Sequence, residues 1–594
     1  MSTLLIQGGT VIDGSGNERF TGDLLVENGI IKSVSKKKIT SHANRKINAD
    51  GLLVTPGWVD IHTHYDGQIT WDKYVTPSSW HGVSTVVMGN CGVGFAPVKK
   101  NNENFLIKLM EGVEDIPETV LAEGVDFNWE TFPEYINHLN SLSRTLDFGV
   151  LVPHIPVRFF AMGLKGADFN SQPTNDEISL MKQIVSESLA SGALGFSTSR
   201  TKKHTTKDGN YVSSLNSGKD ELLGIFSAMK NYTNSLVEVN SDFADSDFEF
   251  IANIALKYNL PLSVLLLQVH NAPQRWNETL SKIKEFKAKG LSVNGQVGSR
   301  PIGMLMSFDG SINPFINSPT FKLINEMPSK EKKENLLLND VKLKIIADTP
   351  KDDHLDWINS LLPRCFKFED NFNYEPKEIQ NILSISRQLN KPPLEVAYDW
   401  MLEKNCERMI YHAFENYNEY NLDVVRTLLA DEDTICGLGD GGAHVGYLCD
   451  SSSVTSMLKY LKSDLSDQNL SIEYLIKKQT KETAHFFGLN DRGVLLQGMK
   501  ADVNLIDFGN LDVTYPSIAH DLPAGGKRVI QKSKGYYKTF VSGVEVYNEF
   551  GFTENFPGRL IKGNQNSYGS FLFFLISKPK LMDKHNGLFS HHFF

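Results

Sequence analysis

Short apolar runs that end in polar or glycine residues recur through the middle of the chain. Runs of about four to eight apolar or β-branched residues are typical of buried strands. Segments with helical spacing separate several of them, such as NDEISLMKQIVSESLASG (175–192), where Asn175 or Asp176 is placed to cap a helix. Examples of these runs are VSTVVMG, DFGVLVPH, GALGFSTS, SLVEVN, LPLSVLLLQ, LSVNGQV, RMIYH and TICGLGD. Counting WVDIHTH (58–64) as the first strand gives about eight units in which a strand ends in polar residues. This alternation predicts an α/β fold, a (β/α)8 TIM barrel with its chemistry at the C-terminal ends of the strands.

Both ends of the chain predict short strands instead. Before residue 57, apolar or β-branched residues are interrupted by Gly, Asn and Asp-Gly, and a similar texture returns in RGVLLQGMKADVNLIDF (492–508) and beyond. Two β-rich ends around a long middle predict one small β-sandwich domain built from residues 1–57 and 488–562, with the barrel over residues 58–487. Two unrelated β caps are the alternative.

Two segments break the alternation. Residues 311–394 are charged and rich in Lys and Asn, with KEKKE at 330–334, and predict an insertion over or beside the barrel mouth that forms a solvated surface excursion. Residues 563–594 have no clear periodicity, so we expect a poorly ordered tail.

Composition narrows the class of protein and its partners. The chain has 594 residues, of which 41% are hydrophobic and 22% charged, as in soluble globular proteins. Its 60 Lys and Arg against 70 Asp and Glu give a net charge of −10, which argues against nucleic acid or an anionic membrane as the main partner and leaves a small-molecule substrate. A homo-oligomer is compatible with the sequence, but no feature supports one.

Cysteine usage and the N-terminus bear on location. The five cysteines are scattered and odd in number, which fits a reducing compartment. The N-terminus has no basic segment followed by an apolar core, and FLFFLI (571–576) is far shorter than the ~20 residues that a membrane helix needs. We therefore expect a cytoplasmic protein.

His62 and His64 close the first predicted strand. Residues i and i+2 of a strand point to the same face, so both imidazoles would point into the barrel and can ligate one metal ion. The alternative is a pair of histidines that only satisfies hydrogen bonds. Their position at a strand end, with Asp66 just beyond, favours the metal site.

Cys91 and Asp440 also follow apolar runs. Cys91 is either a small buried hydrophobe or a thiolate ligand suited to zinc. Asp440, in CGLGDGGAHVG (436–446), can be a ligand, a general base or both, and the alternative is a helix N-cap. His444 lies four residues on and can share the site.

Together these motifs resemble the amidohydrolase superfamily, in its branch of D-aminoacylases (N-acyl-D-amino-acid deacylases). The matching stretches run from Leu4 to about Lys562 and include PGWVDIHTHYD, GVSTVVMGNCGVGFAP, LVPHIPVRFFAMG, GALGFSTSRT, GLGDGGAHVG, RGVLLQGMKADVNLIDF and DLPAGGKRV. The resemblance implies a metal-bearing (β/α)8 barrel with a β-sandwich built from both termini.

The resemblance also implies a mechanism. Zinc lowers the pKa of a water molecule and polarises the amide carbonyl, and an Asp moves the proton from the water to the leaving amine. The positions that match the ligands are His62, His64, Cys91 and Asp440, the last of which is also the acid/base. His154 and Arg158, in PHIPVR, match a segment near the active site and are expected to contact the substrate or transition state.

The chain departs from this branch at two ligand positions. Members usually carry zinc-binding histidines at the ends of the fifth and sixth strands, but the fifth here ends LVEVNSDF (236–243) and the sixth LLLQVHNAP (265–273). Gln268 falls near the expected position and His270 is slightly displaced. Either His270 enters the site or the metal relies on the four residues named above, and we expect one zinc ion.

The residue expected to bind the substrate carboxylate also differs from the pattern of this branch. The branch commonly has an Arg soon after the catalytic Asp, and GDGGAHVGYLCD has none. Arg300 and Arg200 are candidates because a guanidinium binds a carboxylate in a bidentate manner; salt bridging at the surface is the alternative for Arg200.

The sequence is therefore compatible with three functions. The first is hydrolysis of a linear amide, most simply an N-acyl-D-amino acid. The second is hydrolysis of a cyclic amide, whose enzymes typically carry a carboxylated Lys on the fourth strand; the region taken as its match, DFGVLVPH, has none. The third is a catalytically silent binding protein, which the two missing histidines suggest and the retained ligand set opposes.

Overall fold

Eight parallel strands form a nearly closed barrel. The computed structural model describes residues 2–232, 235–244, 246–349, 353–448, 450–461 and 470–563, with only the backbone at 353–355. The barrel order is β16-β12-β11-β10-β9-β8-β7-β6, with bounds β6 (Trp58–Asp60), β7 (Val83–Met88), β8 (Asp147–Pro153), β9 (Gly195–Arg200), β10 (Leu236–Ser241), β11 (Leu262–Leu265), β12 (Val293–Val297) and β16 (Thr434–Cys436). Beyond β6 and β16, His64 N–H donates to Gly441 O (2.8 Å) and Asp440 N–H to His62 O (3.1 Å), which joins the two edges. The predicted barrel is confirmed.

Two details of the predicted barrel are wrong. RMIYH was counted among the barrel runs, but β15 (Ile410–Glu415) pairs with β13 (Ile302–Met306) and β14 (Cys365–Lys367) in a separate antiparallel sheet. DFGVLVPH was matched to the fourth strand, yet β8 is the third in barrel order and β9 is the fourth. Apolar runs alone do not distinguish a barrel strand from a strand of a smaller sheet.

The helix predicted over 175–192 is α6 (Asn175–Ser191), but its cap lies one residue earlier than expected. Thr174, not Asn175 or Asp176, accepts a hydrogen bond from Glu177 N–H, and the Glu177 side chain accepts one from the Thr174 N–H. This capping box satisfies two backbone donors of the first turn. Asn175 and Asp176 are then the first two helical residues.

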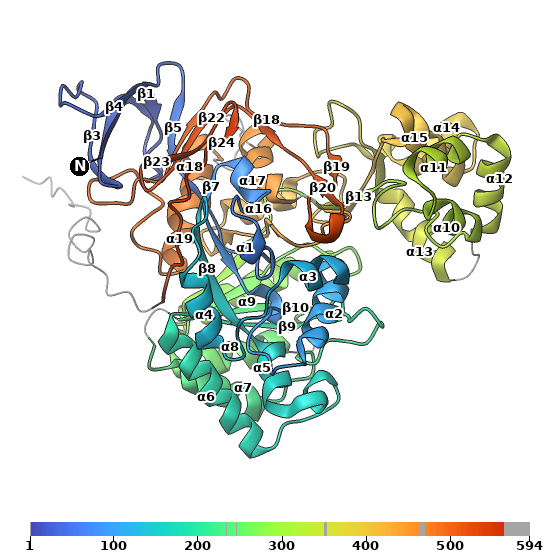
Figure 1. The fold of residues 1–594 in the computed structure, drawn as a ribbon, viewed down its shortest axis with the longest axis horizontal. Helices are drawn as coiled ribbons and strands as arrows, with labels where there is room; N and C mark the ends of the chain where they lie inside the picture. Colours follow the sequence, from blue (N-terminus) through green and yellow to red (C-terminus); the bar gives the residue numbers. More distant parts are fainter. Residues whose placement is uncertain are drawn as a thin grey trace, which may run out of the picture. The chain divides into compact units, whose positions relative to one another are not determined.

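Strands from both ends of the chain share one nine-stranded sheet (Figure 1). From the N-terminal side come β1 (Thr3–Val11), β2 (Phe20–Glu27), β3 (Ile30–Ser35), β4 (Arg45–Asn48) and β5 (Leu53–Pro56); from the C-terminal side come β17 (Val503–Ile506), β22 (Tyr536–Val541), β23 (Val544–Asn548) and β24 (Gly551–Phe552). The ends join where β5 pairs antiparallel with β17, with Val54 opposite Leu505. Both side chains are buried in the core of this sheet. The fold class predicted for the termini is therefore confirmed.

The segment between β13 and β15 is mostly helical, apart from β14. It holds α10 (Pro319–Asn325), α11 (Ser329–Leu336), α12 (Asn339–Asp348), α13 (Asp353–Leu361), α14 (Ile382–Leu389) and α15 (Pro393–Cys406), which form one group in Figure 1. These helices have an apolar core of their own around Phe308, Phe321 and Tyr398. In α11, Lys330 is exposed, whereas Lys332 is buried and donates to Asp309 (2.8 Å). The charged segment predicted at 311–394 thus has a core as well as a solvated surface.

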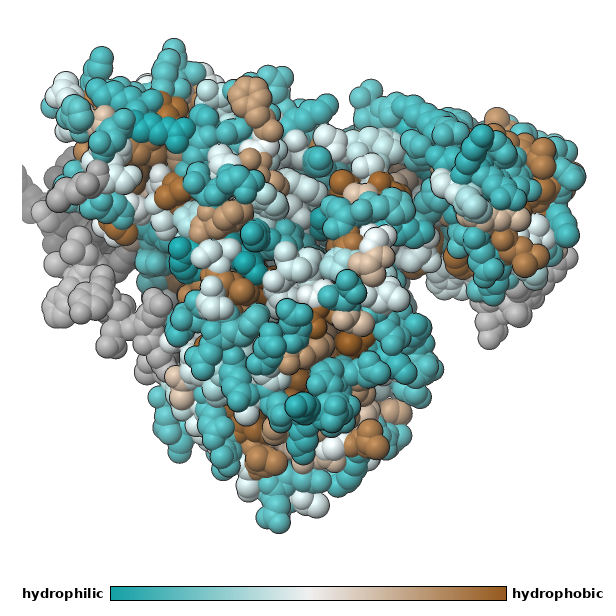
Figure 2. Space-filling model, in the orientation of Figure 1, coloured by the Kyte–Doolittle hydropathy of each residue, from teal (hydrophilic) through white to brown (hydrophobic). Residues whose placement is uncertain are grey.

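Teal, hydrophilic side chains cover most of the face seen in Figure 2. Among the described residues, no helix combines the length and the apolar character that a bilayer crossing requires. The tail predicted at 563–594 lies outside the described residues except for Gly563.

Candidate metal centre

His62, His64 and Cys91 converge at the C-terminal end of the barrel. Their ligand atoms all lie within 4.8 Å of one another, and all three residues are buried. The two histidines follow β6 with the alternation expected of a strand, and Cys91 lies in a tight turn just beyond β7. Gly89 begins that turn with a φ of +80°, and a Cβ there would meet the Leu151 carbonyl. The distance from Cys91 Sγ to His62 Nε2 is 3.4 Å.

Asp440 completes the set from the opposite edge of the barrel. Its Oδ1 lies 3.6 Å from His62 Nε2 and 3.7 Å from His64 Nε2. The glycine that follows, Gly441, is required by packing, because a Cβ there would meet the hydroxyls of Ser78 and Tyr65. The structure therefore brings together all four residues predicted as ligands, and two imidazoles, a thiol and a carboxylate form a donor set that suits zinc.

The pKa shifts of the predicted ligands are also those expected at a site for a cation. Burial raises the pKa of Asp440 well above its usual range, and nearby carboxylates, Asp450 first, raise it further. Burial lowers the pKa of His62 to about 4, so its imidazole is neutral and can offer a lone pair. Burial and then Glu238 raise the pKa of the Cys91 thiol. A divalent cation between these groups would offset the repulsion among the carboxylates and favour the thiolate.

Polar atoms around the centre support the same interpretation. Among the described residues, the buried atoms Asn90 Oδ1, Glu238 Oε1 and His64 Nδ1 have no hydrogen-bond partner. His64 Nδ1 does lie 3.3 Å from Glu114 Oε1, without hydrogen-bond geometry. Buried polar atoms are nearly always hydrogen bonded in folded proteins. Several unpartnered atoms around one centre therefore indicate a site for an ion or a ligand.

Gln296 and Glu238 hold the ligands in place. His62 Nδ1–H donates to Gln296 Oε1 (2.9 Å), and the other end of that amide donates to Ser263 Oγ (2.8 Å). These two hydrogen bonds fix the proton on His62 Nδ1 and leave Nε2 facing Cys91 and Asp440. The Cys91 N–H donates to Glu238 Oε2 (3.0 Å). Sequence reasoning missed both residues, although each is a polar residue within an apolar barrel strand.

Glu114 links His64 to His444. It is the last residue of α2 (Glu103–Glu114), is buried, and has its carboxylate oxygens 3.3 Å from His64 Nδ1 and 3.5 Å from His444 Nε2. His444, predicted to share the site, also contacts the Tyr447 hydroxyl through Nδ1 (3.1 Å). His444 thus adjoins the centre through Glu114. No sequence pattern marks Glu114 as a site residue, because it belongs to an ordinary helical pattern.

His204 is a further residue that sequence reasoning missed. It lies beyond β9, where its Nδ1 contacts Ser199 Oγ at 2.9 Å and its Nε2 lies 3.4 Å from Asn240 Nδ2. Asn240, at the fifth-strand position that lacks a histidine, also donates through Nδ2 to Cys91 Sγ (3.4 Å). One amide nitrogen therefore lies between an imidazole and a thiol, both of which are metal-ligand types.

Gln268 and His270 are not brought to the converging ligands. Gln268 Nε2 donates to Glu419 (2.8 Å), and the Gln268 N–H donates to Asn416 Oδ1 (2.8 Å). His270 Nε2 donates to the Ala413 carbonyl (3.1 Å). Both residues are thus bound to the segment that contains the end of β15 and the loop after it.

The predicted substrate contacts are engaged with the protein itself. His154 Nε2 lies 2.9 Å from Glu221, Arg158 forms an ion pair with the same carboxylate, and all three are buried. Arg300 donates to Asp450 (2.7 Å) and Arg200 to Asp247 (2.8 Å). Each of these side chains thus contacts a carboxylate of the protein, and the pair of Arg200 with Asp247 is the kind of contact that the salt-bridge alternative describes.

Comparisons with known proteins found a matching family model and curated relatives. A model of the amidohydrolase family matches residues 45–352 and 375–547. D-aminoacylase of Alcaligenes xylosoxydans xylosoxydans is 32% identical over 195 residues, 33% of this chain and 37% of that protein. N-acyl-D-aspartate deacylase of the same organism is 31% identical over 198 residues, 33% of this chain and 36% of that protein. The chain thus spans little more than a third of the length of these curated relatives.

Two solved structures share the fold. A crystal structure of D-aminoacylase has a TM-score of 0.60 at 20% identity and covers 94% of this chain and 99% of its own. N-acyl-D-glutamate deacylase of Bordetella bronchiseptica, in complex with zinc and a phosphonate inhibitor that mimics the tetrahedral intermediate, has a TM-score of 0.59 at 20% identity and covers 94% and 99%.

Proposed function

Since the chain belongs to the amidohydrolase family, we propose that it is a metal-dependent hydrolase of linear amides and that its substrates are N-acyl-D-amino acids. The observation that carries the proposal is the convergence of His62, His64, Cys91 and Asp440 at the C-terminal end of the barrel. The similarity to D-aminoacylase and to two other deacylases of N-acyl-D-amino acids supports the substrate class.

One zinc ion would be held by His62, His64, Cys91 and Asp440, with His204 as a further nitrogen bordering the site. When bound, the ion supplies a Lewis acid for the amide carbonyl and lowers the pKa of a water molecule. His62 is aligned for this role by Gln296, which holds its Nδ1 proton (2.9 Å).

Asp440 moves the proton. Without a metal, burial raises the pKa of this carboxyl. Beside a bound cation it would be ionised, and it could accept a proton from the attacking water and return it to the leaving amine nitrogen. Its position 3.6 and 3.7 Å from the two imidazoles keeps that carboxylate at the reacting centre throughout. The same side chain therefore serves both halves of the reaction.

The cyclic-amide alternative has less support. The fourth barrel strand is β9, and GFSTSR contains no Lys to be carboxylated. The retention of the whole ligand set likewise opposes a catalytically silent binding protein.

The experiment is a metal analysis followed by a substrate panel. We expect about one zinc per chain by plasma mass spectrometry, and hydrolysis of N-acyl-D-amino acids in preference to N-acyl-L-amino acids and cyclic imides. Asp440→Asn should lower kcat by at least about 100-fold. Preference for cyclic imides would overturn the substrate class, and full activity of Asp440→Asn would overturn the acid/base role.

A further inference from the structure

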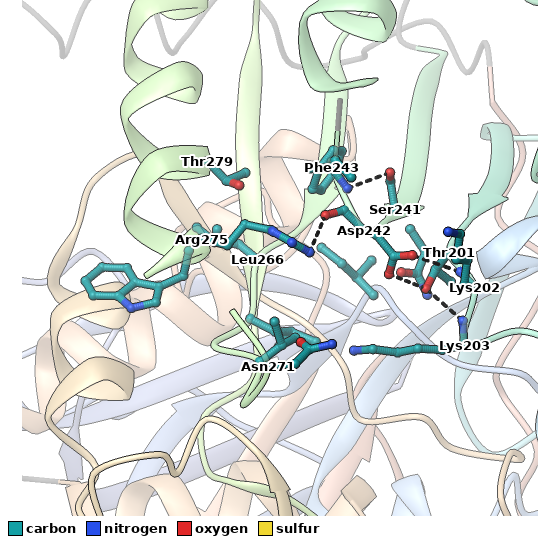
Figure 3. A pocket seen from close by; sticks show the side chains of 16 residues that line it. Thr201, Lys202, Lys203, Ser241, Asp242, Phe243, Leu266, Asn271, Arg275 and Thr279 are labelled. Atoms are coloured by element: carbon teal, nitrogen blue, oxygen red, sulfur yellow. Dashed lines mark hydrogen bonds between the residues drawn. The ribbon is translucent and has the colours of Figure 1, made fainter. Parts of the chain in front are cut away.

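A cavity of about 410 Å3 lies beside the metal centre, over the ends of β9, β10 and β11 (Figure 3). Its volume exceeds the ~30 Å3 share of one water molecule by about an order of magnitude, so it can admit a small organic molecule. Leu265, Leu266, Leu267 and Val269 supply apolar surface, and the loops after β9 and β10 supply polar groups.

The cavity adjoins the ligand set through Asn240. Asn240 lines it, and the Nδ2 of the same residue lies 3.4 Å from Cys91 Sγ. Lys203 also lines it, and the next residue, His204, contacts Asn240 at 3.4 Å. A molecule whose reacting bond is at Cys91 and Asp440 can therefore extend into this space.

The charges lining the cavity favour an anion. Although the whole chain carries −10, the lining has three cations, Lys202, Lys203 and Arg275, against one carboxylate, Asp242. That carboxylate is already used within the protein, since it accepts from Thr201 Oγ1 (2.7 Å) and from Lys202 N–H (2.9 Å). Lys203 forms an ion pair with Glu415.

Arg275 differs from the two arginines predicted as carboxylate anchors. Arg300 and Arg200 are paired with carboxylates of the protein. Among the described residues, the Arg275 guanidinium forms no ion pair, and its one hydrogen bond is from Nη1 to the Asp242 carbonyl (3.0 Å). In Figure 3 this guanidinium lies beside the Asp242 carbonyl, among the side chains that line the cavity. Most of its donors are therefore open to a ligand, and a guanidinium binds carboxylates well.

We propose that Arg275 binds the carboxylate of the N-acyl amino acid and that Leu265, Leu266 and Leu267 contact its apolar side chain. The inference rests on the proposed function, because it names where the acid end of that substrate lies. It makes Arg275 a specificity-determining residue: the cavity selects amides that carry a carboxylate near the scissile bond.

The test compares Arg275→Gln with wild type on a charged and a neutral substrate. The charged substrate is N-acetyl-D-leucine, and the neutral one is its primary carboxamide. The matched control is Lys282→Gln, on the same helix α9 (Arg275–Ala288), whose side chain pairs with Glu249 (2.8 Å) and does not line the cavity.

We expect Arg275→Gln to raise KM for N-acetyl-D-leucine about tenfold to hundredfold, because a hydrogen bond to a charged group is lost. The KM for the carboxamide should stay within twofold, and Lys282→Gln should change neither. An unchanged KM for N-acetyl-D-leucine would overturn the inference, and so would an equal increase for both substrates, which would indicate a structural role.

A binding measurement separates this inference from the proposed function. N-methylphosphonyl-D-leucine and its carboxamide are titrated calorimetrically into zinc-loaded wild type and Arg275→Gln. If wild type hydrolyses no acyl amino acid, the proposed function fails. A loss of affinity in Arg275→Gln for the carboxylate form alone still supports the anchor, and equal affinity of wild type for both forms overturns it.

Discussion

Asn240 Nδ2 lies 3.4 Å from His204 Nε2 and donates to that atom and to Cys91 Sγ at once. The fifth strand thus offers an amide at the position where the family resemblance predicted a histidine, and an imidazole comes from the loop after the fourth strand. Because the amide Nδ2 of Asn240 can only donate, the Nε2 lone pair of His204 faces it, while His204 Nδ1 contacts Ser199 Oγ (2.9 Å).

We therefore expect His204→Ala to weaken zinc binding by about tenfold to hundredfold, as loss of a group that supports a metal does. Competition with a chromogenic chelator measures the change. The control is His485→Ala, an exposed histidine that contacts Asn490. Wild-type affinity in His204→Ala would exclude this residue from the site.

Cys91 is expected to bind the metal as a thiolate. Cobalt-loaded wild-type protein should show the near-ultraviolet charge-transfer band of a thiolate–cobalt bond, and Cys91→Ser should lose it. Cys365→Ser is a matched control, because Cys365 is also buried and also lies near a histidine, with Sγ 3.7 Å from His412 Nδ1. A band that survives in Cys91→Ser would show that the thiol is not a ligand.

The ligands were predictable from the sequence because each belongs to a local pattern. His62 and His64 alternate on one strand face, and Cys91 and Asp440 follow apolar runs that end at the same edge of the barrel. The supporting groups were not predictable, because they depend on which strands become neighbours. Gln296, for example, meets His62 across 234 positions of sequence, and the Cys91 N–H meets Glu238 across 147.

The arginines show the same limit of prediction from sequence, because their partners are distant along the chain. A sequence reveals that a guanidinium is present but not that it is already paired, as Arg300 is with Asp450 across 150 positions. The helix cap at Thr174 shows it on a smaller scale, since three adjacent residues could each cap α6 and local geometry selects one.

His154 and Arg158 are expected to act on stability more than on substrate binding. Both contact the Glu221 carboxylate, and all three side chains are buried. Glu221→Ala should lower the free energy of unfolding by about 3–5 kcal/mol, because it leaves a buried charge unpaired. Urea unfolding measures this loss. A KM that rises severalfold with no loss of stability would instead support the substrate contact predicted from the sequence.

His412 should make stability depend on acid pH. Burial, followed by the charges of His270 and Arg364, lowers its pKa from 6.5 to about 3. Below pH 6.5 the unfolded chain binds a proton there that the folded chain does not, so its contribution is complete above pH 6.5 and is lost as pH falls. Between pH 6.5 and 5 the loss is about 2 kcal/mol. The free energy of unfolding of His412→Gln, measured in urea at both pH values, should fall less than that of wild type, and equal slopes would contradict the assignment.

Gln296 tests whether the orientation of His62 matters for the metal. Its Oε1 accepts the Nδ1 proton of His62 (2.9 Å), while its Nε2 is held by Ser263. Gln296→Met keeps the volume and removes the acceptor, so zinc affinity should fall about tenfold to hundredfold. Gln296→Glu keeps an oxygen in that position and should retain most of the affinity that Gln296→Met loses. Equal losses in the two variants would mean that packing around Gln296, and not the hydrogen bond to His62, supports the metal centre.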